Sequence, residues 1–222
     1  AENEASGVIR NIDADVTAQA SWYSGAISGR NFGTIDLITV HDSDISGYGG
    51  CIVDTNYGTI NRSVVRSSSC QGAIAYDNGG VISNIHVEDG VSSSYGVVRD
   101  ALGDMSNSMV EDFNAFSSLS YSHLDAFSTN YVATVINFSY HSTWRPAVFS
   151  KSSTSTGSNN YWLNTTNNPD TCHVGGQSGC TAITDITYFY NASNPPFDSW
   201  DFTNVWMERS GDYPCLRGLS CS

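Results

Sequence analysis

This sequence is poor in charge and especially in lysine. Only 14% of its 222 residues are charged, Lys151 is the single lysine, and the formal net charge is −13. A surface with this balance repels phosphate backbones and anionic lipid headgroups, so we expect no nucleic acid among the partners. No apolar run approaches the roughly 20 residues that a membrane-spanning helix needs. We therefore also expect no membrane insertion.

Several signatures of enzymes and metal proteins are missing as well. No H-E-x-x-H, P-loop or EF-hand pattern occurs, and residues 25–29 and 176–179 miss the G-x-S-x-G spacing of a nucleophile elbow. We predict no catalytic residues, no cofactor and no metal site. No segment keeps the helical period of 3.6 residues over a useful length, which argues against a helical core.

What the sequence does contain is a pair of glycine motifs that recurs about every 25 residues. The first motif begins at Gly25, Gly50, Gly72 and Gly96, and the second at Gly7, Gly33, Gly58, Gly80 and Gly103. A fixed period of this length is typical of stacked repeats. Counted from the second glycine, position two is always Ile or Met and position seven is always Ala or Val. Position five is Ile12, Ile38, Ser63, Ile85 or Ser108.

This pattern predicts an all-β fold, a parallel β-solenoid (β-helix) of about six coils with an irregular, disulfide-bearing C-terminal cap. Stacking the coils at roughly 4.8 Å places each isoleucine on its equivalent and buries an edge that one coil cannot bury alone. Positions two and five break strict alternation, so we expect a bend or bulge between them. The glycines would supply positive φ or close backbone approach at the corners.

The repeat frame fades after Gly103, and the composition changes again near Gly157. We predict solenoid repeats over residues 1–156, irregular after about 111, and a cap over residues 157–222. The cap segment holds four of the six cysteines and four of the five prolines. It would cover the unpaired strand edges at the end of the solenoid. Because the repeat is already running at Gly7, we expect this chain to be the C-terminal part of a longer fibrous protein.

The six cysteines occur without a C-x-x-C pair, which favours disulfides over a zinc site. Six cysteines allow 15 connectivities, and of these we predict the sequential one, Cys51–Cys70, Cys172–Cys180 and Cys215–Cys221. Disulfides in turn predict an oxidising, extracellular location.

The repeat unit G-x-I-x(4,5)-G-x-I-x-N is similar to the GLUG repeat of bacterial surface and secreted proteins. Its clearest instance is GAIAYDNGGVISN at residues 72–84. The ending also resembles that of such arrays, with NYWLN at 160–164, WDFTNVW at 200–206 and GDYPCLR at 211–217. The resemblance covers residues 7–110 and 157–217. It implies β-helical adhesins and fibre segments at the cell surface, and it carries no catalytic residues.

Two sets of aromatic residues are candidates for ligand binding. Tyr23 and Tyr48 lie two residues before the first glycine of their units, and Tyr95 is one residue off that place. The second set falls where the repeat breaks, and broken rules tend to mark functional places; it comprises His123, Phe127, Tyr131, Tyr140, His141 and Trp144. Exposed rings suit the faces of sugars. Packing at the corners is the alternative use of the tyrosines.

Polar residues recur with the frame too. Stacking in register would align His41, Arg66, Glu88 and Glu111 in one ladder, and Asp42, Asp89 and Asp112 in another. Such carboxylates could serve glycoside hydrolysis or bind Ca²⁺, whereas a solvated corner is the simpler interpretation. Asn31, Asn56 and Asn78 each precede the second glycine by two residues and predict a hydrogen-bonded asparagine ladder.

These patterns predict a non-enzymatic extracellular adhesin or fibre-tip domain that binds a cell-surface ligand, with a glycan as the expected ligand. A homotrimer is the expected assembly, because it would bury aromatic surface between residues 120 and 150. The alternative is a β-helix carbohydrate-active enzyme, a glycoside hydrolase or a polysaccharide lyase. It would use carboxylates from the set Asp42, Glu88, Asp89, Glu111 and Asp112.

Overall fold

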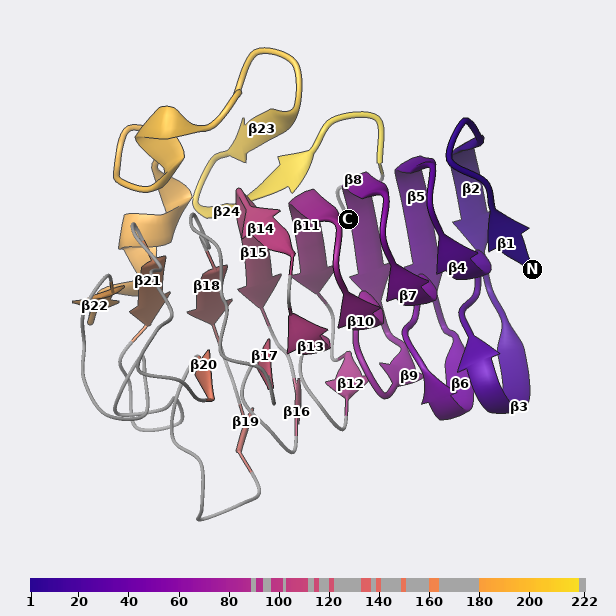
Figure 1. Cartoon of the computed structure of the whole chain (residues 1–222). Coiled ribbons are helices and arrows are strands. Elements are labelled where there is room, and N and C mark those ends of the chain that lie inside the picture. The colour runs from indigo at the N-terminus through magenta and orange to yellow at the C-terminus, as the bar shows by residue number, and fades with distance from the viewer. Residues whose placement is uncertain are drawn as a thin grey trace.

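The computed structural model describes residues 1–88, 91–93, 97–101, 103–111, 114–115, 120–121, 133–136, 139–140, 149–150, 160–163 and 180–219. Over these residues the chain is an all-β, parallel β-solenoid (Figure 1), as the glycine frame predicts. About four coils, from β1–β3 to β10–β12, are described nearly throughout, and shorter strands continue the stack. This part of the chain thus holds fewer coils than the six that were predicted.

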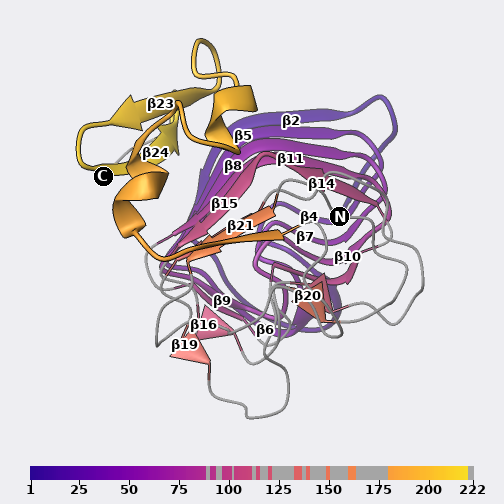
Figure 2. The ribbon, with the colours of Figure 1, turned by 90° about the vertical axis from the view of Figure 1, so that its left-hand side faces the viewer.

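Three parallel sheets run along the sides of the stack, which Figure 2 shows from the end where β21 lies. Sheet 1 contains β1 (Glu2–Asn3), β4 (Ser28–Asn31), β7 (Val53–Asn56), β10 (Ala75–Asn78), β13 (Val98–Ala101), β17 (Ser120–Tyr121) and β20 (Phe149–Ser150). Sheet 2 contains β2 (Val8–Ala14), β5 (Thr34–His41), β8 (Thr59–Arg66), β11 (Val81–Glu88), β14 (Asp104–Ser106), β15 (Ser108–Glu111), β18 (Ala133–Ile136), β21 (Asn160–Leu163) and β22 (Cys180–Ile183). Sheet 3 contains β3 (Thr17–Ser24), β6 (Asp44–Gly49), β9 (Ser69–Cys70), β12 (Ser92–Ser93), β16 (Asn114–Ala115) and β19 (Ser139–Tyr140).

The core is built by equivalent residues of successive coils lying side by side. Strand pairing in sheet 2 aligns position two as the row Ile9, Ile35, Ile60, Ile82 and Met105. Position seven forms the row Ala14, Val40, Val65, Val87 and Val110. From the second coil onward these side chains are buried in one cluster, to which the first glycine motif adds Ile52, Ile74 and Val97. The predicted core residues therefore form the core. Burial of each such side chain stabilises the fold by about 1.5–3 kcal/mol.

The expected bend between positions two and five is present in the first five coils of sheet 2, from β2 to β14 and β15. The residue at position four has a left-handed backbone, with φ of 58° at Asn11, 56° at Leu37, 45° at Arg62, 53° at Asn84 and 47° at Asn107. This single left-handed residue resets the alternation, so that positions two, five and seven all face inward.

Two serines occupy position five without leaving a buried hydroxyl unsatisfied. Ser63 Oγ donates to the carbonyl of Asn61 (3.0 Å), and Ser108 Oγ donates to that of Ser106 (2.8 Å). Ser108 Oγ also accepts from the amide of Ile85 in the preceding coil (3.4 Å). Because a buried hydroxyl is tolerated when it is hydrogen-bonded, serine can replace isoleucine here.

The glycines of the frame serve close backbone approach and not positive φ, so one of the two predicted roles was wrong. The described glycines with positive φ are Gly47, Gly211 and Gly218, none of which belongs to the frame. A Cβ on Gly58 would instead lie 2.7 Å from the carbonyl carbon of Phe32 in the preceding coil. Only a residue without a side chain lets the two backbones meet there.

The asparagine ladder is present and has one more member than was predicted. Nδ2 of Asn3 donates to Oδ1 of Asn31 (2.7 Å), Asn31 to Asn56 (2.7 Å) and Asn56 to Asn78 (2.8 Å). All four side chains are buried. The ladder therefore ties four coils together at the corner between sheets 1 and 2.

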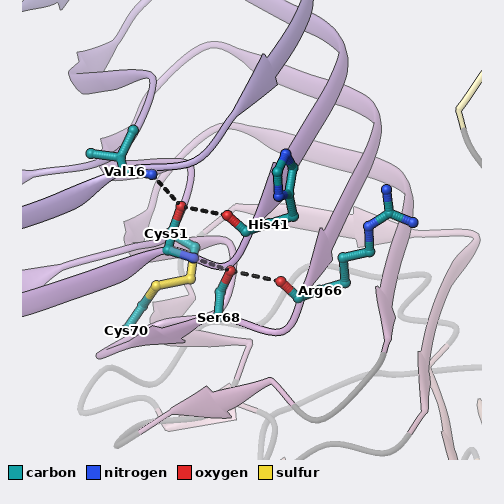
Figure 3. Close-up of a disulfide and its surroundings, with 7 residues drawn as sticks. Val16, His41, Cys51, Arg66, Ser68 and Cys70 are labelled. Carbon is teal, nitrogen blue, oxygen red and sulfur yellow. Dashed lines mark hydrogen bonds between the residues drawn. A yellow bond between two sulfur atoms is a disulfide. The ribbon is translucent and has the colours of Figure 1, made fainter.

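A chain of serine hydroxyls joins the coils at the corner between sheets 2 and 3, and a disulfide lies at the end of sheet 3 that leads to sheet 1 (Figure 3). Cys51 and Cys70 are bonded, as predicted, with their Cα atoms 5.4 Å apart. Ser43 Oγ accepts from the amide of Val16 (2.9 Å), and Ser68 Oγ accepts from the amide of Ser43 (3.1 Å). Each hydroxyl thus joins its coil to the one before.

The other two predicted disulfides are not tested by the described residues. Cys215 is disulfide-bonded to a cysteine whose side chain lies outside them. Cys172 and Cys221 also lie outside, and for Cys180 the backbone alone is described.

The C-terminal segment lies along the side of the solenoid. β22 adds a strand at the end of sheet 2, and the chain then forms the 3-10 helices η1 (Ile186–Tyr190) and η2 (Phe197–Ser199). An antiparallel hairpin of β23 (Trp206–Arg209) and β24 (Asp212–Leu216) follows. In Figure 1 this orange and yellow segment lies over the outer face of sheet 2. The boundary predicted near residue 157 falls outside the described residues.

Apolar residues on the outer face of sheet 2 explain this placement. Val64 and Met109, both at outward position six, are buried in one cluster with aromatic residues of the tail, namely Phe189, Phe197, Trp200, Trp206 and Tyr213. Large apolar side chains that face outward on a solenoid need a cover. The described tail supplies it for the middle coils. No helix of the described ranges is long and apolar enough to cross a membrane.

Candidate ligand-binding surface

Most of the predicted binding residues fall where the structure gives no side chain. Tyr95, His123, Phe127, Tyr131, His141 and Trp144 lie outside the described residues. Tyr23 in β3 and Tyr140 in β19 are described by their backbone alone. Ser24 pairs with Gly49, but the register of β3 and β6 shifts between Ala20 and Ser24, so the predicted alignment of Tyr23 with Tyr48 is not tested.

Tyr48 is the one predicted binding residue whose side chain is described. It is 41% exposed, and its ring meets that of the buried Tyr76 edge-on at a centroid distance of 5.7 Å. The equivalent place in the next coil belongs to Cys70, which is bonded to Cys51. The aromatic row therefore stops before the coil of Cys70. Tyr48 is partly exposed and also packs at the corner, so both predicted uses of this tyrosine apply.

The first polar ladder is in register as predicted, but its carboxylate is engaged. Arg66 pairs with His41 on one side and with Glu88 on the other. Glu88 is buried, with its carboxylate 3.2 Å from Nδ1 of His86 and 3.9 Å from Arg66. Glu111 is described by its backbone in β15.

Of the second ladder only Asp42 is described. It lies at an exposed left-handed corner (φ 48°) and contacts Nδ1 of His41 at 3.0 Å. Asp89 and Asp112 lie outside the described residues. Among the residues that are described, no group of three or more His, Cys, Asp or Glu side chains could hold a metal ion.

A different surface gathers the exposed rings that the structure does describe. Phe32 and Tyr57 each directly precede the second glycine of their unit and stack face to face, with centroids 5.3 Å apart and planes 19° apart. They are 39% and 57% exposed. In two other units the residue that directly follows the second glycine is also exposed; these residues are Val8 and Val81. These four side chains form what we term the aromatic ridge.

Beside the aromatic ridge lies a cluster of two arginines on one buried aspartate. Asp36 is only 2% exposed, yet its Oδ2 lies 3.0 Å from Nε of Arg10. Arg62 donates from Nε to Oδ1 of the same carboxylate (2.7 Å) and from its terminal NH2 to Oδ2. The hydrogen bond with Asp36 raises the pKa of Arg62 above its ordinary value. We term these three residues the arginine cluster.

The valines of the aromatic ridge lie in sheet 2 two positions before the row of Arg10 and Asp36, and its two rings lie at the corner just before the sheet. Val8 is aligned with Thr34, and Arg10 with Asp36. Residues two apart on a strand face the same side at about 7 Å. The ridge therefore runs next to the cluster over the first coils of the stack.

A chain of hydrogen bonds links the arginine cluster to the tail. Trp206 Nε1 donates to Oδ1 of Asn84 (3.3 Å), and Asn84 Nδ2 donates to Oδ1 of Asn61 (2.8 Å). Asn61 Nδ2 in turn donates to Asp36 (3.3 Å). The tail thus packs over the middle of sheet 2 and fixes the polar row that continues to its open end.

No protein-family model, no curated protein and no solved structure matches this chain. Functional conclusions rest on the geometry of this surface.

Sequence reasoning missed this surface, although a signal was available. The motifs Asn31-Phe32-Gly33 and Asn56-Tyr57-Gly58 place a ring between a buried asparagine and a glycine in two consecutive coils. The neighbours of the ring are fixed to the corner, so the ring itself can only point outward. The arginine cluster had no comparable signal, because its members occupy positions three and four of different coils.

Proposed function

We propose that this protein is a non-enzymatic, extracellular adhesin or fibre-tip domain of the GLUG-like kind that its repeats resemble, and that its ligand is a cell-surface glycan. The observation that carries the proposal is the stacked pair Phe32 and Tyr57, exposed on a rigid corner of the solenoid. Rings held in this way lose little conformational freedom when a ligand binds, because the stack already restricts their rotamers.

The chemistry of the aromatic ridge fits a sugar. Pyranose rings present C–H groups on their faces and hydroxyl groups around their rims. The aromatic ridge offers ring carbon to the former, while Arg10 and the row of threonines Thr34 and Thr59 offer polar groups to the latter. A few polar groups beside an apolar platform are the usual means of orienting a small ligand.

The state of the described carboxylates supports a binding role over hydrolysis. An acid and a base or nucleophile must face one substrate in glycoside hydrolysis. Glu88 is instead buried against His86 and Arg66, and Asp36 is held by two arginines. The disulfide Cys51–Cys70 supports an oxidising location.

A glycan-array screen of the full chain, with the native mass measured on the same sample, tests the proposal. We expect saturable binding without product release, and the native mass checks the predicted homotrimer. The double variant Phe32→Ala/Tyr57→Ala should lose about 10-fold or more in affinity, since two ring contacts disappear. Tyr48→Ala, which removes a ring of similar exposure at another corner, is the matched control and should change affinity by less than about 2-fold.

Three outcomes would contradict parts of this account. If a folded chain binds no glycan, the proposed function is wrong. If it releases sugar products, the non-enzymatic assignment is wrong. If Tyr48→Ala abolishes binding and the double variant does not, the ligand binds at the Tyr23/Tyr48 row and not at the aromatic ridge.

A further inference from the structure

We propose that Arg10 is a fork for the carboxylate of an acidic sugar, so that the surface selects carboxylated glycans. This inference rests on the proposed function and names its ligand class. It starts from the charge balance within the arginine cluster. The one carboxylate of Asp36 faces two guanidinium groups, those of Arg10 and Arg62. The cluster therefore carries one uncompensated positive charge in a chain whose net charge is −13.

The buried carboxylate already accepts three hydrogen bonds without Arg10. Arg62 engages both oxygens of Asp36, and Asn61 Nδ2 adds a third donor. Arg10 lies on the solvent side, with 52% of its side chain exposed against 29% for Arg62. The surplus charge is thus on Arg10.

Arg10 meets Asp36 at one nitrogen and is otherwise half exposed. Its ion pair with Asp36 runs through Nε. Arg62, by contrast, donates to Asp36 from Nε and from a terminal nitrogen. A guanidinium whose closest contact is at Nε can offer its two terminal nitrogens to a ligand as a planar fork. That geometry matches the two oxygens of a carboxylate.

The surroundings select a ligand with few negative charges. Asp13, which is 73% exposed, lies on the same strand face as Arg10, three residues further on. Densely sulfated or phosphorylated polymers would be repelled by such carboxylates and by the net charge of the chain. A glycan with an isolated carboxylate can meet the guanidinium of Arg10 without bringing further negative charge close to Asp13. Hexuronic acids and sialic acids share this chemistry.

The distance to the aromatic ridge suits a short oligosaccharide. Phe32 precedes Asp36 by four residues, and Asp36 is the strand partner of Arg10. Phe32 lies at the corner before β5, so these four residues span at most about 14 Å. One sugar can lie against the ring of Phe32 while a neighbouring carboxylated sugar reaches Arg10. The aromatic ridge supplies general affinity, and Arg10 supplies the choice of acidic sugar.

The direct test follows the arginine Nε–Hε signals of the ¹⁵N-labelled full chain by NMR. Glucuronic acid, N-acetylneuraminic acid and glucose are titrated separately. We expect the first or the second to shift the Arg10 signal saturably, and the one that does so identifies the source of the carboxylate. Glucose should leave that signal unmoved. Equal shifts with glucose, or no shift with either acid, would overturn the inference.

Variants extend the test to oligosaccharides that the array identifies. Arg10→Gln should weaken binding of the carboxylated form about 10-fold or more and leave its carboxyl-reduced form unchanged. Arg10→Lys keeps the charge but loses the fork, so we expect an intermediate loss. Arg30→Gln removes the same charge from an exposed pair with Glu2 on sheet 1 and is the matched control.

The two proposals fail separately. If glycans bind through the aromatic ridge and Arg10→Gln does not distinguish the carboxylated from the reduced form, the adhesin function stands and the inference is wrong. If no glycan on the array binds but glucuronic acid still shifts the Arg10 signal, the fork stands and the proposed function is wrong.

Discussion

Replacing Asn56 by alanine tests whether the asparagine ladder holds the coils together. Asn56 is fully buried, accepts from Asn31 Nδ2 at 2.7 Å and donates to Asn78 Oδ1 at 2.8 Å. The variant deletes these two ladder bonds, which dominate the expected loss, and two longer bonds from Asn56 Nδ2 to the carbonyls of Gly58 (3.3 Å) and Val81 (3.4 Å). It leaves the core rows of sheet 2 untouched, so the effect reports on the ladder.

The expected loss follows from counting the groups that remain. Two hydrogen bonds of about 0.5–1.5 kcal/mol each disappear. The stranded amide of Asn31 keeps a bond to the carbonyl of Thr59 (3.2 Å), and the stranded Oδ1 of Asn78 keeps one from the amide of Gly80 (3.2 Å). These second partners hold the desolvation cost near its lower limit of about 1 kcal/mol for each group. We therefore expect the free energy of unfolding to fall by about 3–5 kcal/mol.

Urea unfolding followed by circular dichroism measures the total loss, and hydrogen exchange locates it. The amides of residues 28–31 and 53–56 should lose protection first, because a repeat array opens locally. Asn204→Ala, which removes an exposed asparagine bound to Asp201, is the control and should cost less than about 1 kcal/mol. If Asn56→Ala costs no more than this control, the ladder contributes nothing to stability and the reasoning is refuted.

Three further predictions concern the frame, the disulfide and the tail. Gly58→Ala should lower the free energy of unfolding by at least about 3 kcal/mol, because the added Cβ would meet backbone atoms. Gly79→Ala is its control and should cost less than about 1 kcal/mol, because there the added Cβ would meet a ring edge at 3.2 Å. Thermal denaturation of the two variants compares these losses. Cys51→Ser should lower the free energy of unfolding, measured in urea, by about 3 kcal/mol. This is the chain-entropy value for a disulfide between residues 19 positions apart, Cys51 and Cys70. Trp206→Ala empties a fully buried site and should cost about 3–5 kcal/mol, with limited proteolysis cutting the tail before the coils; equal protease resistance would show that the tail is held elsewhere.

The solenoid was predictable because its physics repeats with the chain. One left-handed residue at position four brings positions two, five and seven to the same side, and the apolar residues at these positions recur with the glycines. Asn31, Asn56 and Asn78 could be read from the same frame. Asn3 could not be read from the frame, because its spacing differs. Three residues lie between Asn3 and Gly7, whereas only one residue lies between Asn31 and Gly33. The extra residues form a turn, closed by a bond from the amide of Gly7 to the carbonyl of Glu4 (2.7 Å).

The place of the tail was not predictable from the frame, because it depends on the outward face. Outward position six reads Asp13, Thr39, Val64, His86 and Met109 along the stack. Such a mixed row shows no apolar pattern in the sequence. It is the stacking in space that puts Val64 and Met109 near each other, with His86 between them and its ring 6.2 Å from that of Trp206. A contact that one row makes with a distant segment cannot be derived from the period of the row.

The same row explains why the open part of sheet 2 lies at the first coils. Where position six is Val64, His86 or Met109 the tail covers the sheet, and where it is Asp13 an exposed carboxylate would oppose such a cover. The arginine cluster begins at this uncovered end, and its aspartate is anchored through Asn61 and Asn84 to Trp206 of the tail. The tail thus leaves Arg10 and Phe32 accessible while it fixes the polar row on which Arg10 depends. Affinity for a carboxylated glycan should accordingly fall in Trp206→Ala although Trp206 touches no part of the aromatic ridge, and an unchanged affinity would separate the tail from the site.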